Sequence, residues 1–202
     1  MGVVVATLAL QLALPGDVAV RPWWLLPSMS ALLVGALLLV NPGKMDHFSA
    51  VERVISLLVV AAVTLVNGGS AVLLVYGIAT ATLTAPAGAV LLSGGIVYWT
   101  NIVAFSLWYW EFDRGGPGRR ALGRHVFPDL QFPQMADPDL AKQDWEPSYL
   151  DYLYFSFTNA AAFSPTDVLP LRIWAKMTMM LQAVISLVLA LMVVAWAINN
   201  LK

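Results

Sequence analysis

The sequence contains no cysteine and few charged residues, and each shortage excludes a class of function. Without cysteine the chain can form neither a disulfide nor a thiolate metal site. Charged residues make up 11% of the chain and the net charge is −1, so no basic surface for nucleic acid is expected. The two histidines, His47 and His125, lie far apart in predicted loops and indicate neither a metal site nor a cofactor.

Catalytic motifs are missing as well. The chain has no HExxH, no GxSxG and no paired-aspartate motif, so we do not expect an enzyme. Apolar residues make up 59% of the chain, against about 45–50% in soluble domains. They form continuous runs without an alternation of period two, which excludes an outer-membrane barrel. The composition therefore predicts an all-α membrane protein.

Six apolar segments predict about six transmembrane helices, since a span needs about 20 apolar residues and the first segment is short. They are Gly2–Leu14, Leu25–Val40, a segment from Ser49 to about Val66, Ala71–Leu83, Val90–Phe112 and Ile173–Leu201. A tight turn at Asn67-Gly68-Gly69-Ser70 is predicted to separate the third from the fourth.

A different pattern fills the chain between the last two spans. Asp113–Pro147 is rich in Pro, Gly, Asp and Arg and has no helical periodicity, which indicates a loop. An aromatic segment long enough for a short helix follows, from Ser148 to about Asn159, and then a turn interrupted by proline. A short helix, a non-helical backbone and a second helix form the layout of a re-entrant pore loop.

The residues from Thr158 to Lys176 carry a family resemblance. Asp167 is followed by Pro170, Trp174 and Lys176 at the spacing D-x-x-P-x-x-x-W-x-K, after an aromatic lead-in. This pattern resembles the pore module of tetrameric potassium channels, which consists of outer helix, pore helix, filter and inner helix. The resemblance implies an all-α, potassium-channel-like fold with a re-entrant pore helix between the fifth and sixth spans, assembled as a homotetramer.

The resemblance also implies a division of the chain. Residues 1–86 would hold four N-terminal transmembrane helices, which lack the arginines of a voltage sensor. Residues 87–202 would form the pore-like domain. Its parts would be an outer helix (88–112), an extracellular loop (113–147), a pore helix (148–159), a filter-like loop (160–170) and an inner helix (171–201).

The filter-like segment departs from the family pattern. Ser164 and Thr166 stand where the potassium channels have glycines. A ladder of carbonyls aimed at the axis needs backbone angles that glycine reaches without penalty, and Pro165 fixes its own φ near −65°. A potassium-selective filter is therefore not expected. Hydroxyl and carboxylate rings would favour monovalent cations, whereas a ring of Phe163 would gate or plug a pore.

Each candidate residue has a structural reading beside the functional one. The candidates of the filter region are Thr158, Asn159, Ala162, Phe163, Ser164, Pro165, Thr166 and Asp167. Asp167 forms either a ring at the pore mouth or a brace against the pore helix, and Ser164–Thr166 either line a pore or make a tight turn. Asn159 either faces a cavity or caps its helix. Gln182 and Ser186 share one face of the last helix, where they either line a pore or hydrogen-bond between helices.

These observations predict a multi-pass protein of the cell (plasma or inner) membrane. Its partners would be the lipid bilayer and further copies of itself, and its function that of an ion-channel-like protein with an atypical or occluded filter. The alternative is a non-conducting scaffold or binding protein with the same fold. Six spans would place the loop 113–147 outside, opposite Lys44, His47 and Arg53, although its arginines conflict with the positive-inside rule.

Overall fold

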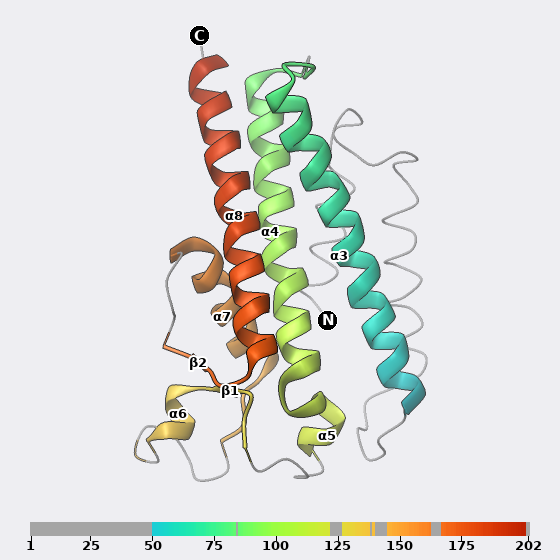
Figure 1. Cartoon of the computed structure of the whole chain (residues 1–202), viewed down its shortest axis with the longest axis vertical. Coiled ribbons are helices and arrows are strands. Elements are labelled where there is room, and N and C mark those ends of the chain that lie inside the picture. Colours follow the sequence, from blue (N-terminus) through green and yellow to red (C-terminus); the bar gives the residue numbers. More distant parts are fainter. Residues whose placement is uncertain are drawn as a thin grey trace.

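The computed structural model of the chain describes residues 50–83, 85–121, 127–137, 139, 145–162 and 167–200 (Figure 1). Three of its helices are long and apolar enough to cross a membrane: α3 (Ala50–Ala79), α4 (Ala87–Phe112) and α8 (Ile173–Asn200). The prediction of an α-helical membrane protein is confirmed at this level. The predicted spans Gly2–Leu14 and Leu25–Val40 lie outside the described residues.

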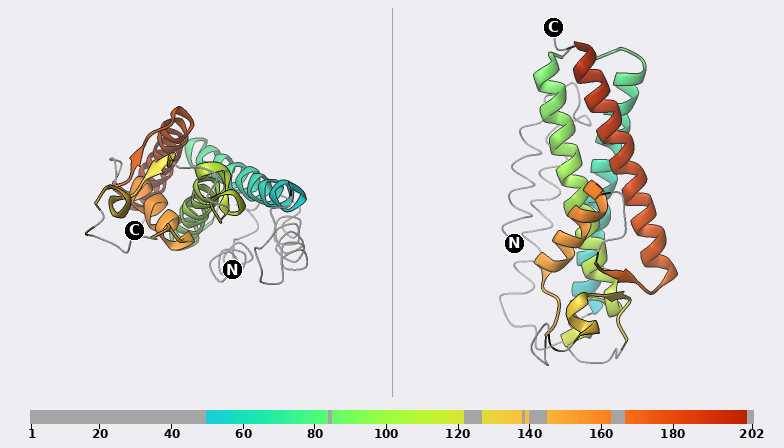
Figure 2. Two further views of the ribbon diagram at one scale, coloured as in Figure 1. Left: turned by 90° about the horizontal axis from the view of Figure 1, so that it is seen from below. Right: turned by 90° about the vertical axis from the view of Figure 1, so that its left-hand side faces the viewer.

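Helix α4 lies at the centre of the described helices. It contacts α3, α8 and the short helix α7 (Tyr149–Ala162), and most of its residues are buried (Figures 1 and 2). It packs tightly against α8 at Gly94, where an added Cβ would lie 2.6 Å from Val193 Cγ1. A helix that is apolar on all sides is typical of a buried position, and α4 has that character.

The predicted turn at Asn67–Ser70 is wrong, because α3 is one continuous helix of 30 residues that passes through it. Asn67 and Ser70 are buried, whereas Gly68 is exposed on the opposite side. With its amide oxygen turned toward the Asn101 backbone nitrogen, Asn67 pairs with that N–H and with the Val97 carbonyl, each at 3.2 Å. A neighbouring helix thus satisfies the amide of Asn67, the first residue of the predicted turn.

This continuity changes which ends of the helices lie together. Ser56, near the start of α3, donates a hydrogen bond to Glu111 at the end of α4. The start of α3 and the loop after α4 therefore lie at the same end of the bundle, here named the loop end (Figure 1). The expectation that Arg53 lies opposite the loop 113–147 is wrong for this reason.

The loop between α4 and α7 contains short ordered elements at the loop end. They are the 3-10 helix η1 (Asp113–Gly115), α5 (Pro117–Ala121), strand β1 (Leu130–Gln131) and α6 (Pro133–Ala136). After α7, strand β2 (Leu169–Pro170) pairs antiparallel with β1, with Leu130 opposite Pro170. Residues 169–170 of the predicted filter-like loop therefore belong to a two-stranded sheet.

Helix α7 runs along only half of the bundle. Its first residue, Tyr149, contacts Ser106 near the end of α4, and Ala160 contacts Tyr98 near the middle of α4. Val168 is again buried beside Tyr109 and Leu130, close to the loop end. The chain thus runs into the helix bundle along α7 and is back at the loop end by Val168 (Figures 1 and 2). Fourteen residues at about 1.5 Å each make about 21 Å, less than the roughly 30 Å of a bilayer core.

The observed bounds differ from the predicted ones at the end of α7. The pore helix was predicted to end at Asn159, but α7 continues to Ala162, so the first three residues of the predicted filter-like loop are helical. The outer and inner helices correspond to α4 and α8 within two residues at each end.

Replacing Gly68 by Ala tests the continuity of α3. An added Cβ at Gly68 meets nothing within 4 Å, and alanine favours a helix interior over glycine by about 0.5–1 kcal/mol. We expect Gly68→Ala to raise the thermal unfolding temperature of the full chain in detergent. Gly116→Ala is the contrasting variant and should lower the unfolding temperature, because φ at Gly116 is +97° and a Cβ there would lie 3.0 Å from the Glu111 carbonyl oxygen. A loss of stability in Gly68→Ala would indicate the turn instead.

Candidate functional site

The candidate site is the attachment of the half-helix α7 to α4 and α8. Its centre is Gln182, which is completely buried on α8. The Gln182 amide nitrogen donates to the Ser156 carbonyl and hydroxyl, at 2.9 and 2.7 Å. Its oxygen accepts from Tyr109 at 2.8 Å and from Asn159 at 2.9 Å. One side chain of α8 therefore joins α4 and α7, and both of its polar atoms are satisfied.

Further hydrogen bonds hold α7 against the backbone of its neighbours. Ser156 donates to the Ile102 carbonyl at 2.7 Å, and Asn159 donates to the Met179 carbonyl at 3.1 Å. The Tyr98 hydroxyl donates to the Ala160 carbonyl at 2.8 Å, in the last turn of α7, where carbonyls lack intrahelical partners. The Tyr98 bond compensates a terminal carbonyl of a short helix in apolar surroundings, where an unpaired group is costly.

One turn further along, Asn101 of α4 donates to Ser186 of α8 at 3.1 Å. Ser186 is completely buried and Asn101 nearly so. This contact joins α4 directly to α8. Asn101 also lies beside Asn67 of α3, so polar contacts at this level join three helices.

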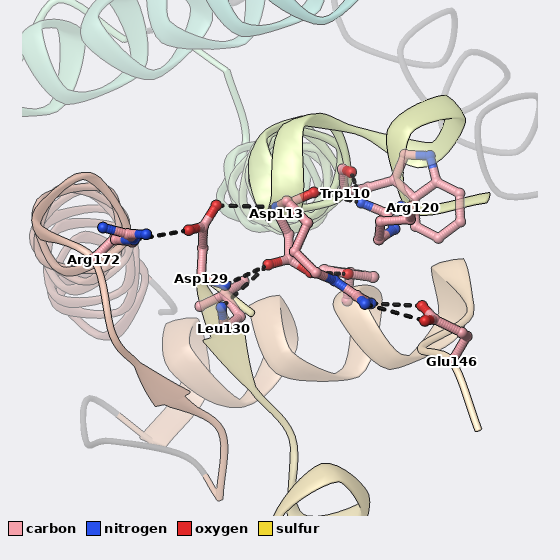
Figure 3. A network of polar contacts seen from close by, with 9 residues as sticks. Trp110, Asp113, Arg120, Asp129, Leu130, Glu146 and Arg172 are labelled. Carbon is pink, nitrogen blue, oxygen red and sulfur yellow. Dashed lines mark hydrogen bonds and ion pairs between the residues drawn. The ribbon is translucent and has the colours of Figure 1, made fainter. Parts of the chain in front are cut away.

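A second network lies at the loop end, around the buried side chain of Asp113 (Figure 3). One carboxylate oxygen accepts the backbone N–H groups of Asp129 and Leu130, at 3.0 and 3.2 Å. The other accepts the hydroxyl of Tyr152, in the second turn of α7. Burial, together with the adjacent Asp113, raises the pKa of Tyr152, so the phenol keeps its proton and donates it. Asp113 thereby ties the end of α4 to β1 and α7.

Two arginines complete this network (Figure 3). Arg114 makes a two-pronged ion pair with Glu146, with distances of 3.1 and 2.6 Å, just before α7 begins. Arg120 donates to the carbonyls of Trp110 and Asp113 at the end of α4, and its guanidinium lies 4.3 Å from the centre of the Trp110 ring. A cation at a helix C-terminus is favoured by the helix dipole. Both arginines are buried and serve packing at the loop end.

The start of α8 is attached to the same network. Asp129 accepts the Arg114 backbone N–H at 3.0 Å through one carboxylate oxygen, and Arg172 donates to the other at 3.1 Å (Figure 3). The Leu171 N–H also donates to the Asp129 carbonyl at 2.9 Å. The segment that returns from α7 is therefore held at the loop end before α8 begins.

Aromatic rings fill the space between the two networks. Tyr152 makes edge contacts with Trp110 and Phe132, at centroid distances of 5.4 and 5.3 Å, and Phe155 packs against Tyr109 at 4.7 Å. The aromatic residues of the predicted pore helix thus alternate between this core and the outer surface, where Tyr154 and Phe157 are exposed. Offset and edge contacts of this kind are worth about 0.5–1.5 kcal/mol each beyond their burial.

The arrangement positions a helix and leaves its end open. Among the described residues, no group of three His, Cys, Asp or Glu side chains could hold a metal ion. The polar atoms around Gln182 are paired with one another, so they do not form a binding site for a ligand. Ala161 and Ala162, by contrast, are exposed at the end of α7. The open part of the site is therefore the end of α7.

The structure places the predicted site residues in different surroundings. Phe163, Ser164, Pro165 and Thr166 lie outside the described residues. Thr158 bonds within its own helix, to the Tyr154 and Phe155 carbonyls. The predicted cap or cavity role of Asn159 is wrong, since its side chain is buried and donates to α8. Asp167 is exposed, and the hydrogen bonds described for α7 do not include it, which does not support the predicted brace.

Gln182 and Ser186 take one of the two roles that the sequence left open. Gln182 faces α4 and α7 inside the protomer, Ser186 faces α4, and both hydrogen-bond between helices. They are fully buried, so the pore-lining role is not available to them in this arrangement.

Sequence reasoning missed the network around Asp113. Most of its residues belong to the loop after α4, for which the sequence predicts only a hydrophilic loop, and Arg172 directly precedes α8. The loop residues are Asp113, Arg114, Arg120, Asp129 and Glu146. The usable signal was an acid-base pair directly after a strongly apolar helix, followed by Gly115-Gly116. Both glycines have positive φ, and so does Arg114, which turns the chain back over the end of α4.

Replacing Gln182 by Met tests the central network. Methionine has a similar length but cannot satisfy Tyr109, Asn159 and Ser156, and each buried group left unpaired costs about 1–3 kcal/mol. We expect a clear fall of the unfolding temperature in detergent. Leu181→Met is the matched control, because Leu181 is the adjacent residue and 56% exposed. Equal stability of the two variants would contradict the central role of Gln182.

Replacing Asp113 by Asn tests the network at the loop end. The amide keeps one acceptor and places a donor against other donors, and hydrogen bonds to a charged group are worth about 1.5–3 kcal/mol each. We expect a loss of about 2–3 kcal/mol in the free energy of unfolding. Asp137→Asn, at an exposed position of the same loop, should change stability by less than about 0.5 kcal/mol. A neutral Asp113→Asn would show that the carboxylate charge is not needed.

The comparisons with known proteins return nothing similar. No family model matches the chain, and neither a curated protein nor a solved structure matches it. Function is therefore argued from the half-helix α7, its attachment and the sequence that follows it.

Proposed function

We propose that the chain is a channel-like membrane protein in which α7 is a re-entrant helix. The observation that carries this proposal is that α7 begins at the loop end, reaches the middle of α4 at Tyr98, and is followed by a return to the loop end at Val168. With α3, α4 and α8 across a bilayer, a segment of this course enters the membrane and leaves on the same side. Pore loops have that course.

The exposed end of α7 supports assembly of several copies. A non-helical backbone within the bilayer is tolerated only where protein covers it or where it lines a water-filled cavity. Ala161 and Ala162, the last two residues of α7, are exposed in the single protomer. Copies arranged around a common axis would enclose the α7 ends, and closed cyclic assembly is the usual solution for identical chains. The homotetramer is the form that the resemblance implies.

The ion selectivity of such a pore rests on the sequence. Ser164 and Thr166 replace the glycines of a potassium filter, and Pro165 between them stiffens the backbone. We propose a filter that is not selective for potassium, or one that is occluded by Phe163. Monovalent cations are the class of ion that hydroxyl groups and the exposed Asp167 would favour.

The outer face of α8 favours an occluded pore or a non-conducting role. Gln182 and Ser186 point into the protomer, so between Lys176 and Trp196 the exposed side of α8 offers only apolar side chains to a central axis. Between Met177 and Ala195 its exposed residues are Met177, Met180, Leu181, Val184, Leu187, Val188, Leu191, Val194 and Ala195. Apolar constrictions close pores by dewetting. This observation supports the second candidate function, a membrane scaffold or binding protein that retains the fold without conducting.

Flux measurements separate the two functions. The full chain is purified, its oligomeric state is determined in detergent and in lipid, and Na⁺, K⁺ and Cl⁻ flux is measured in liposomes. Val184→Asn places an amide on the outer face of α8, where Val184 is 59% exposed, and Phe163→Ala removes the aromatic ring. If α8 lines a pore, we expect Val184→Asn to increase cation flux at least about tenfold over the parent, because a polar lining removes a dewetting barrier. If the Phe163 ring occludes the pore, we expect Phe163→Ala to increase cation flux by a similar factor.

The matched control is Val72→Asn on α3, where Val72 is 67% exposed on another helix. It should leave flux unchanged. A tetramer that stays silent in every gradient with both Val184→Asn and Phe163→Ala would overturn the channel proposal and leave the scaffold. A monomer in lipid would overturn the fourfold assembly.

A further inference from the structure

The positive charges of the described residues gather at the loop end. Arg53 lies near the start of α3, one turn before Ser56, which is bonded to Glu111 at the end of α4. Five more basic residues belong to the loop after α4 and to the start of α8: Arg114, Arg119, Arg120, Arg172 and Lys176. The sequence places Arg124 and Lys142 in the same loop, outside the described residues.

The opposite end of the described helices carries no such charge. The connection from α3 to α4, residues 80–86, contains no Lys or Arg, and α8 ends on Asn199 and Asn200. Loops on the cytoplasmic side of membrane proteins carry an excess of Lys and Arg close to the helix ends. Among the described residues the asymmetry is therefore six basic side chains against none, and the sequence places one more, Lys202, two residues after the end of α8.

We infer that the loop end is the cytoplasmic face of the protein, and that α7 enters the membrane from the cytoplasm. The conflict with the positive-inside rule arose from the predicted turn at Asn67–Ser70, which added a membrane crossing and moved Arg53 to the other side. With α3 as one helix, Arg53 and the loop arginines lie on one side and agree with the rule. This orientation is opposite to the extracellular loop that the potassium-channel resemblance implies.

The orientation has two consequences for the site. The exposed part of the loop end, including the 64% exposed side chain of Arg172 and the exposed Lys176, meets the anionic headgroups of the cytoplasmic leaflet. Any ion or ligand that reaches the end of α7 along the re-entrant segment comes from the cytoplasm. The inference rests on the crossings of α3, α4 and α8, and it holds whether or not the protein conducts.

Single cysteines test the orientation, because the chain has no cysteine of its own. Thr82→Cys lies in the connection between α3 and α4, and Ala136→Cys lies in α6 at the loop end; both positions are exposed and uncharged. A membrane-impermeant maleimide is applied to intact cells and to permeabilised cells, with the parent chain as the blank. We expect Thr82→Cys to react in intact cells and Ala136→Cys to react only after permeabilisation.

Each other pattern overturns the inference. The reverse pattern would place the loop end outside, and reaction of both cysteines in intact cells would mean that α4 does not cross the membrane between them. Reaction of both only after permeabilisation would place both ends inside. Flux is not used in this experiment, so a silent channel does not affect its outcome.

A second variant tests whether the charges set the orientation. Thr80→Lys and Thr82→Lys together add two basic residues to the uncharged connection, with Thr80→Gln and Thr82→Gln as the matched control. In the Ala136→Cys background, we expect the lysine pair to raise the fraction labelled in intact cells and the glutamine pair to leave it unchanged. An increase with glutamine as large as with lysine would contradict the role of charge.

Discussion

A helix that ends halfway through apolar surroundings must have its backbone polar groups satisfied by its neighbours, and the rest of this structure depends on that constraint. The hydrogen bonds around α7 meet it from both sides. Tyr98 of α4 bonds the Ala160 carbonyl, and Gln182 of α8 bonds the Ser156 carbonyl. In the other direction, the Asn159 side chain of α7 donates a hydrogen bond to the Met179 carbonyl of α8. Apolar packing alone would hold α7 beside its neighbours without determining its depth, whereas these directional bonds define its position along α4.

The network at the loop end holds the first turns of α7 and the start of α8. Asp113 is buried at the end of α4, and its oxygens accept donors from β1 and from Tyr152 of α7. A buried carboxylate is costly unless it is paired, and removal of one partner leaves a charge without compensation. The arrangement is therefore sensitive to any displacement of β1 or α7. It holds the entry of α7 and, through Asp129 and Arg172, the start of α8 at the same level.

The two networks differ in the kind of polar side chain that they contain: one, inside the bundle, has neutral groups, and the other, at the loop end, has charged groups. Around Gln182, in the middle of the bundle, the side chains are amides and hydroxyls, which join helices at modest cost in an apolar medium. The ionised groups, Asp113, Arg114 and Glu146, occur at the loop end, where Glu146 is exposed. This division agrees with a membrane boundary near the end of α4.

The sequence by itself determined the class of the protein and the approximate ranges of three helices in its second half. Long apolar runs predict membrane helices because an apolar helix is stable only where lipid or protein surrounds it, and α4, α7 and α8 lie close to the predicted ranges. Tertiary structure decided what local signals could not. Asn67-Gly68-Gly69-Ser70 has the composition of a turn, yet α4 satisfies Asn67 and the helix continues. Gln182 and Ser186 share a face, but only the positions of α4 and α7 determine that this face points inward. The groups that donate hydrogen bonds to the Asp113 carboxylate belong to Asp129, Leu130 and Tyr152, which lie 16, 17 and 39 residues away along the chain, so their pairing depends on how the chain returns to the loop end.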